Sequence, residues 1–141
     1  MSAEAEFTLT GRDRLLERVT SARWETILAE SALAVISLHV LDDNFFQPQP
    51  GTSVGDHLVS GLVPFVLLLV FAAVYPRLRP GLRASLAALV GLFGVATGIE
   101  GVYYAHSGRI AGDDYTGIAA ALAGLVLIGL AVTTLDRKSV V

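Results

Sequence analysis

The chain has 141 residues, of which 53% are hydrophobic and only 16% are charged. A soluble domain carries about 25% charged residues, and a domain of this size has too much surface to hide so many apolar side chains. We therefore expect an integral membrane protein. The absence of Cys excludes disulfides, zinc–thiolate sites and thiol nucleophiles. The net charge of −3 argues against nucleic-acid binding.

Four apolar stretches follow a polar start, at about residues 24–41, 56–75, 82–104 and 114–135. An 18-residue helix is ~27 Å long, close to the thickness of the hydrocarbon core of a bilayer. Trp24, Tyr75, Tyr104 and Tyr115 supply the aromatic side chains that membrane interfaces favour. The predicted fold class is an all-α, integral membrane four-helix bundle.

Basic residues lie almost entirely on one side of the predicted spans, with Arg109 alone on the other. The nine on the first side are Arg12, Arg14, Arg18, Arg23, Arg77, Arg79, Arg83, Arg137 and Lys138. The positive-inside rule then predicts a protein of the cell membrane with both termini in the cytoplasm. The chain divides into a cytoplasmic segment at 1–23, a four-span membrane domain at 24–135 and a cytoplasmic tail at 136–141.

The segment before the first span has the pattern of a short amphipathic helix. Leu15, Leu16, Val19 and Ala22 recur on one helical face, and arginines flank that face. We expect an interfacial helix on the inner leaflet, held by anionic headgroups. A lipid-sensing or regulatory role for this helix is the alternative.

Small residues form a stripe along the third span. Gly91, Gly94, Gly98 and Gly101 are three or four positions apart, which places them on one helical face and permits close approach of a second backbone. The matching stripe on the fourth span consists of Gly117, Ala121 and Gly124. The pattern predicts that spans three and four pack together within one chain, with homodimerisation as the alternative.

The side opposite the termini contains all three histidines and six acidic residues against one base. A polar site is predicted at the outer ends of spans one, two and three, formed by His39, Asp42, Asp43, Asp56, His57 and Glu100. Imidazole and carboxylate groups are ligands of Zn²⁺, Mn²⁺ and Fe²⁺. One hypothesis is therefore a divalent-metal site with the ligands His39, Asp42, His57 and Glu100. The alternatives are a hydrogen-bonded network that organises the outer loops, and solvated acids.

Helix ends account for part of this acidity without any ligand. Ser53 to Asp56 has the form of a capping box at the start of span two. In contrast, Asp42, Asp43 and Glu100 fall at the C-terminal ends of spans, where the helix dipole disfavours negative charge. These three carboxylates require a counter-charge, water or a bound cation.

Glu30 lies about 9 Å beyond Trp24 along the first span, on a different face from His39. A carboxylate within a membrane suggests proton coupling. A four-span chain with one such carboxylate in its first span resembles the small multidrug-resistance exporters. The alternative is a hydrogen bond of Glu30 with Ser37, with Thr97 or with a neighbouring chain.

Three runs on the predicted outer side resemble a known family: His39 to Ser53, Asp56 to Leu62, and Asp113 to Gly117. They are similar to the N-terminal membrane region of actinobacterial proteins in which a dienelactone-hydrolase-like α/β-hydrolase domain follows the last span. The likeness extends from about Trp24 to Leu135. It implies a hydrolase as a partner, in the same protein or acting in trans, whose nucleophile lies outside the 141 residues.

The sequence contains no nucleophile elbow, P-loop or dinucleotide-binding glycine motif. We therefore expect a non-enzymatic membrane anchor or a sensing and interaction module, with a cation or polar headgroup at its outer site. Two alternatives stay open: a small proton-coupled transporter that uses Glu30, and a metal-dependent membrane hydrolase that uses the outer cluster. Homo-oligomerisation is compatible with each of them.

Overall fold

The computed structural model describes residues 11–47, 51–108 and 112–139, and every regular element in these ranges is helical. Four helical segments are long and apolar enough to cross a membrane: Leu15–Phe46, Val54–Arg77, Pro80–Tyr104 and Asp114–Arg137. The predicted all-α fold with four apolar spans is therefore confirmed. The elements are α1 (Gly11–Leu41), η1 (Asp42–Phe46), η2 (Val54–His57), α2 (Leu58–Val74), η3 (Tyr75–Arg77), α3 (Pro80–His106) and α4 (Gly112–Ser139).

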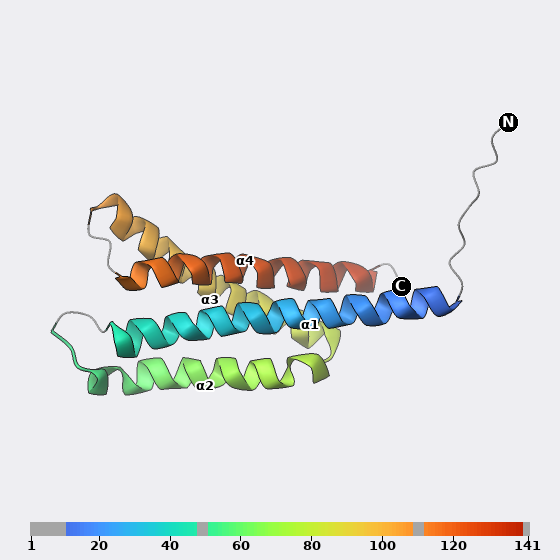
Figure 1. Ribbon diagram of the computed structural model, residues 1–141, viewed down its shortest axis with the longest axis horizontal. Coiled ribbons are helices and arrows are strands. Elements are labelled where there is room, and N and C mark those ends of the chain that lie inside the picture. The colour runs from blue at the N-terminus through green and yellow to red at the C-terminus, as the bar shows by residue number, and fades with distance from the viewer. Residues whose placement is uncertain (1–10, 48–50, 109–111, 140–141) are drawn as a thin grey trace.

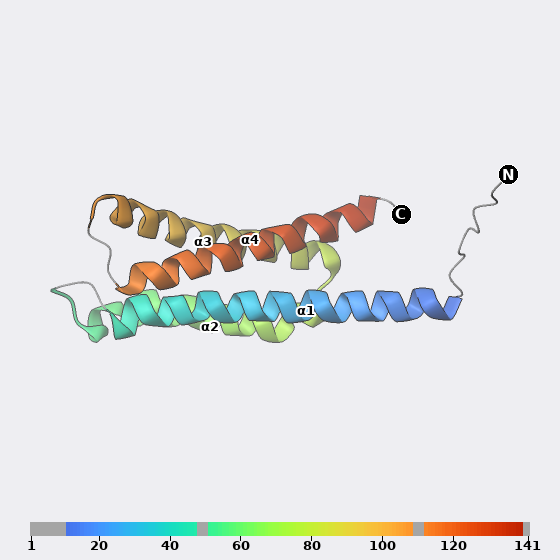
Figure 2. The ribbon, with the colours of Figure 1, turned by 45° about the horizontal axis from the view of Figure 1, so that its top comes forward.

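The long helices pack in the order α2, α1, α4, α3 (Figure 1). Helix α1 contacts α2 on one side and α4 on the other, and α4 packs along α3 (Figure 2). We name the two ends of this bundle by the polar residues of α1 that lie there. The Glu25 end holds the connection from α2 to α3 and the end of α4, and the His39 end holds the end of α1 and the start of α4.

Helix α1 is uninterrupted from Gly11 to Leu41. The residues expected to form a separate interfacial helix are thus its first turns. Leu15, Leu16 and Val19 are exposed there, because this part of α1 extends beyond the other three helices (Figure 1).

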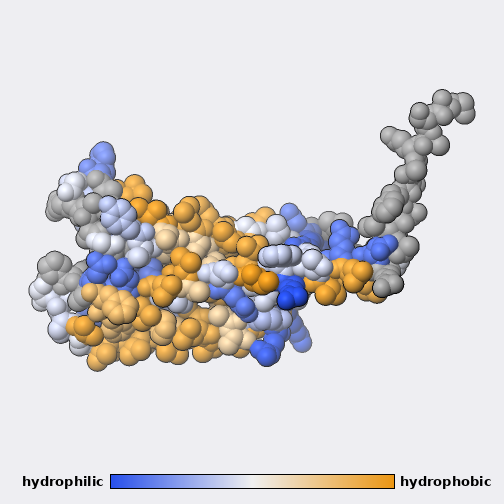
Figure 3. Space-filling model, in the orientation of Figure 1, coloured by the Kyte–Doolittle hydropathy of each residue, from blue (hydrophilic) through white to orange (hydrophobic). Residues whose placement is uncertain are grey.

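Apolar side chains are divided between a small core and a large outer surface. Leu33, Ile36, Tyr75 and Leu127 are the largest fully buried side chains, whereas most large hydrophobic residues of α2 point outward. Figure 3 shows hydrophobic surface over the middle of the bundle and hydrophilic residues toward its two ends. This hydrophobic belt has the polarity profile that a bilayer requires.

Glycines bring the backbones of α3 and α4 into contact. A Cβ atom added at Gly94 would lie 2.7 Å from the carbonyl oxygen of Ala120. A Cβ atom added at Gly98 would overlap the side chain of Ala121. The predicted packing of these two spans within one chain is therefore confirmed.

Candidate functional site

The six predicted site residues are divided among separate groups at the His39 end. His39 and Asp42 belong to a network between α1 and α4, whereas Asp56 and His57 form hydrogen bonds close to them in the sequence. Glu100 is exposed on α3.

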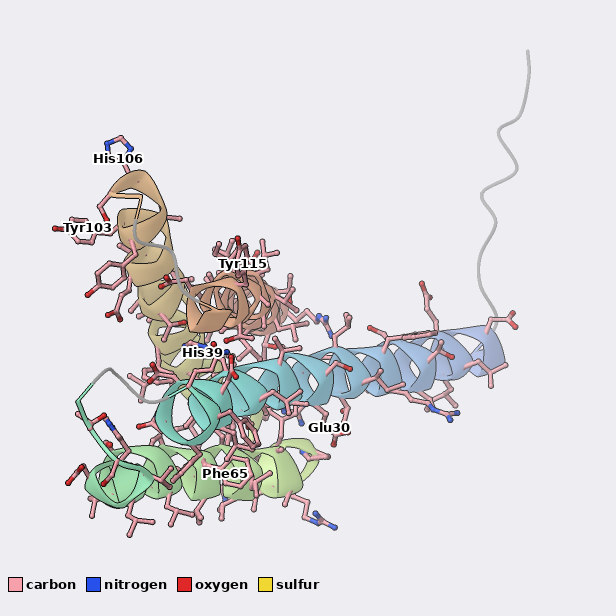
Figure 4. The ribbon with its side chains drawn as sticks, turned by 60° about the vertical axis from the view of Figure 1, so that its left-hand side comes forward. Glu30, His39, Phe65, Tyr103, His106 and Tyr115 are labelled. Carbon is pink, nitrogen blue, oxygen red and sulfur yellow. The ribbon has the colours of Figure 1, made fainter. Side chains whose placement is uncertain are left out.

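His39 and Asp42 are linked through Thr116 of α4. His39 Nδ1 lies 3.0 Å from Thr116 Oγ1, and the Thr116 hydroxyl donates to Asp42 Oδ2 at 2.8 Å. A carboxylate only accepts hydrogen bonds, so the Thr116 proton is directed to Asp42 and Thr116 Oγ1 accepts from His39 Nδ1–H. Figure 4 shows His39 between α1 and α4, and its side chain is buried.

The position of Asp42 is fixed by a π-helical turn that ends α1. The Gln47 N–H donates to the Asp42 carbonyl at 2.8 Å, and Gln47 Nε2 donates to the two carboxylate oxygens at 3.1 and 3.2 Å. Gly112 at the start of α4 leaves room for Gln47, because a Cβ atom there would overlap that side chain. Turns of this type recur at functional sites, and the residue pattern of α1 gives no signal for this one.

Asn44 joins the same turn to α2, although it was not among the predicted site residues. Its Nδ2 donates to the Val40 carbonyl at 2.9 Å and to Asp43 Oδ2 at 3.1 Å, and Ser60 Oγ donates to Asn44 Oδ1 at 3.1 Å. Gly61 permits this contact, because a Cβ atom there would lie 2.7 Å from Asn44 Cβ. Asp43 is thus held in a joint between helices.

Asp56 and His57 are held within their own segment of the chain. The Ser53 N–H and hydroxyl donate to Asp56 Oδ2 at 2.8 and 2.7 Å, which confirms the predicted capping-box contact. His57 Nε2 lies 2.8 Å from Thr52 Oγ1. Neither side chain joins the network of His39.

The described residues contain no group of three or more His, Cys, Asp or Glu side chains that could hold a metal ion. The expected ligand set of His39, Asp42, His57 and Glu100 is not assembled, and metal binding has no support within these ranges. The C-terminal end of α3 diverges from the start of α4, so that His106 points away from His39 (Figure 4). Arg109, the one basic residue predicted on this side of the membrane, lies outside the described residues.

Glu30 is exposed and forms no hydrogen bond or ion pair with the described residues. The expected bonds to Ser37 and Thr97 are absent from these ranges, and the Thr97 hydroxyl donates to the Gly94 carbonyl instead. Figure 4 shows Glu30 on the side of α1 that faces away from α4. The contact with a neighbouring chain is the alternative that stays open.

The principal ion pairs lie at the Glu25 end, at a residue that the sequence patterns did not single out. Glu25 is only 6% exposed, and its carboxylate accepts hydrogen bonds from Arg83 Nη1 at 3.0 Å and from Arg137 Nη1 at 3.2 Å. Thr134 Oγ1 lies 3.5 Å from the same carboxylate. One buried carboxylate therefore ties α1 to both α3 and α4.

Arg83 also holds the connection between α2 and α3. Its Nη2 donates to the carbonyls of Pro76 and Leu78 at 3.5 and 3.3 Å. Its guanidinium carbon lies 5.2 Å from the ring centroid of Tyr75, a distance at which a cation is attracted to the ring face. The available signal in the sequence was the carboxylate beside Trp24, because Arg83 near the start of the third span and Arg137 after the fourth are expected at the same depth.

Comparisons of the chain with protein-family models, with curated proteins and with solved structures find no match. No functional residue can therefore be transferred from a relative, and the function must be inferred from the geometry.

Proposed function

We propose that the chain is a multi-pass membrane anchor and interaction module whose His39 end binds a cation or a polar headgroup outside the cytoplasm. The observation that supports this proposal is the combination of four apolar helices with polar joints at both ends. Glu25 ties α1 to α3 and α4, and Thr116 ties α4 to the end of α1. These contacts between helices hold the four spans in a fixed arrangement and leave the exposed surface of the His39 end available to a ligand.

The charges at the two ends support an orientation with both termini in the cytoplasm. Exposed arginines gather at the Glu25 end, at positions 23, 77, 79 and 137. Carboxylates gather at the His39 end, where Asp42 and Asp43 are half-buried. The positive-inside rule favours the Glu25 end as the cytoplasmic one, and the acidic end then attracts cationic ligands by its field.

The resemblance to membrane regions that precede a hydrolase gives the anchor a role. A hydrolase attached to the cytoplasmic side, or recruited from solution, would be held at the membrane by the four spans. Its active site would lie on the opposite side of the bilayer from His39. The His39 end would then serve ligand recognition.

A reporter experiment tests the anchoring role. A fluorescent protein is fused after Val141, and membranes are washed with alkaline carbonate, which removes peripheral proteins. We expect the fluorescence to stay in the membrane pellet, and a fusion that lacks residues 24–135 to be released. Release of the full fusion would contradict the proposal.

A proton-coupled transporter is a second candidate, supported by the exposed carboxylate of Glu30 within an apolar span. Its test uses the chain in liposomes that contain a pH-sensitive dye. The anchor proposal predicts no proton flux above that of empty liposomes under an imposed pH gradient. Flux that is lost in Glu30→Gln but kept in His39→Ala would favour the transporter instead.

A further inference from the structure

We infer that His39 Nε2 is the hydrogen-bond acceptor of a binding site for a primary ammonium group. This inference rests on the proposed ligand-binding role of the His39 end. The ammonium group could belong to an ethanolamine lipid headgroup or to a free amine in solution, because both present the same donors to the site.

The first step is the tautomer of His39. Asp42 accepts the Thr116 hydroxyl proton at 2.8 Å, and Thr116 Oγ1 therefore accepts from His39 Nδ1 at 3.0 Å. A neutral imidazole carries one proton, so a proton on Nδ1 leaves a lone pair on Nε2. The relay from Asp42 through Thr116 thus turns Nε2 into an acceptor.

The second step is the availability of that lone pair. His39 is 8% exposed, and its ring has no other hydrogen bond to the described residues. Among their side chains, Arg83 Nε is the one fully enclosed nitrogen or oxygen that lacks a hydrogen-bond partner. The Nε2 atom of His39 is therefore unpaired, but it is not sealed off from the surface.

The third step is the rigidity of the acceptor. His39 Cε1 lies against Gly117, where an added Cβ atom would be 3.4 Å away. Gln47 holds Asp42 in place at the other end of the relay. An acceptor that is already fixed in position loses little freedom when a ligand binds, which favours affinity.

The fourth step is the choice of ligand. The Nε2 lone pair accepts a hydrogen bond only from an N–H or O–H donor, and the acidic His39 end, where Asp42 and Asp43 are half-buried, favours a donor with positive charge. A primary ammonium has that charge and offers three N–H donors. A choline headgroup has positive charge but no N–H donor, and a phosphoglycerol headgroup adds negative charge. His39 lies seven residues before the end of the candidate span Leu15–Phe46, in the part of α1 that is nearest to the headgroups of the outer leaflet in the proposed orientation.

Solid-state NMR of the chain with ¹⁵N-labelled histidine, in nanodiscs, tests the inference. In phosphatidylcholine discs we expect His39 to show the Nδ1–H tautomer. An increasing mole fraction of phosphatidylethanolamine should then shift the His39 Nε2 resonance. His106, which is exposed at the end of α3, provides an internal reference whose resonance should not respond.

Variants of Thr116 separate the relay from mere packing. Thr116→Val removes the hydroxyl that accepts from His39 Nδ1, so the proton is no longer held on Nδ1. The ammonium group then loses its charge-assisted hydrogen bond to Nε2, which corresponds to about tenfold weaker binding. Thr116→Ser keeps the hydroxyl and should retain both the Nδ1–H tautomer and the binding. This variant still tests the relay if Thr116→Val fails to fold, because loss of either property in Thr116→Ser would contradict it. Thr133→Val is the matched control, because that hydroxyl bonds only to the Leu130 carbonyl in its own helix.

Two arms distinguish the sources of the ammonium group. A shift with phosphatidylethanolamine alone identifies a headgroup, and a shift with free ethanolamine in phosphatidylcholine discs identifies a soluble amine. An unchanged His39 resonance in both arms, or an equal shift with phosphatidylglycerol, would overturn the inference. A stabilisation by ethanolamine lipid that persists in His39→Gln would refute the role of His39 while leaving the proposed ligand binding intact.

Discussion

Glu25 and Arg83 are 58 residues apart in the sequence, and Arg83 Nη1 lies 3.0 Å from Glu25 Oε1. The pair joins α1 to α3, two helices that are separated in the packing order by α4. Arg137 on α4 binds the second oxygen of the same carboxylate. The three helices are therefore fixed to one another at a single buried group.

Glu25→Gln should destabilise the protein strongly, because it leaves the guanidinium of Arg83 without its charge partner. Removal of one member of a buried pair costs about 3 kcal/mol of unfolding free energy. Arg137→Gln should cost only about 1 kcal/mol or less, because the Arg137 side chain is 55% exposed. Unfolding in mixed detergent micelles measures both variants. Equal losses in the two would contradict the assignment of Glu25 and Arg83 as the principal pair.

Gly94→Ala should destabilise the contact between α3 and α4. The added methyl group would lie 2.7 Å from the Ala120 carbonyl oxygen, so the helices must separate, at a cost of about 1–3 kcal/mol. Gly129→Ala is the matched control, because nothing lies within 4 Å of an added Cβ atom there. The control should be neutral or gain about 0.5–1 kcal/mol from helix propensity. Thermal melts that rank the two variants in the opposite order would refute the packing.

Ser60→Ala should weaken the joint between α2 and the end of α1. It removes the donor to Asn44 Oδ1, and an unsatisfied buried acceptor costs about 1–3 kcal/mol. Ser85→Ala is the control, since the Ser85 hydroxyl is exposed and bonds to the Gly81 carbonyl in its own helix. Urea unfolding of the two variants in detergent gives the comparison. A loss in Ser85→Ala as large as that in Ser60→Ala would show that the joint does not stabilise the fold.

Glu30→Leu should leave the stability in nanodiscs unchanged or raise it, because no hydrogen bond to the described residues is lost and an exposed charge is removed from an apolar belt. Glu25→Leu should lower the stability in the same assay. A destabilised Glu30→Leu variant would instead indicate that a second chain supplies a partner for this carboxylate. Crosslinking at equal protein concentration would then identify the oligomer.

The four spans and the packing of α3 on α4 could be predicted because both depend on local patterns. Apolar length marks a span whatever surrounds it, and glycines three and four positions apart share a face in any helix. The contact between Ser53 and Asp56 is equally local, because it joins residues three positions apart.

The distinction between Glu25 and Glu30 could not be predicted. Both lie in the first span, and five residues rotate the side chain by about 140° around the helix axis. Which of the two faces inward depends on how α1 is rotated against α3 and α4, and this rotation is set by packing across the whole bundle. For the same reason, the hydrogen bond between Asp42 and Thr116 could not be predicted, because the two residues are 74 positions apart and meet only through the packing of α1 against α4.

The most direct test of a four-span module with polar ends on opposite sides of a membrane is cysteine accessibility, since the chain has no native Cys. Single cysteines replace Thr52 or Ser107 at the His39 end, Arg79 at the Glu25 end, and Leu67 in the hydrophobic belt. An impermeant maleimide should label the first two in intact cells, the cysteine at 79 only after permeabilisation, and the cysteine at 67 in neither case. Labelling of both ends from the same side, or of position 67, would contradict the account.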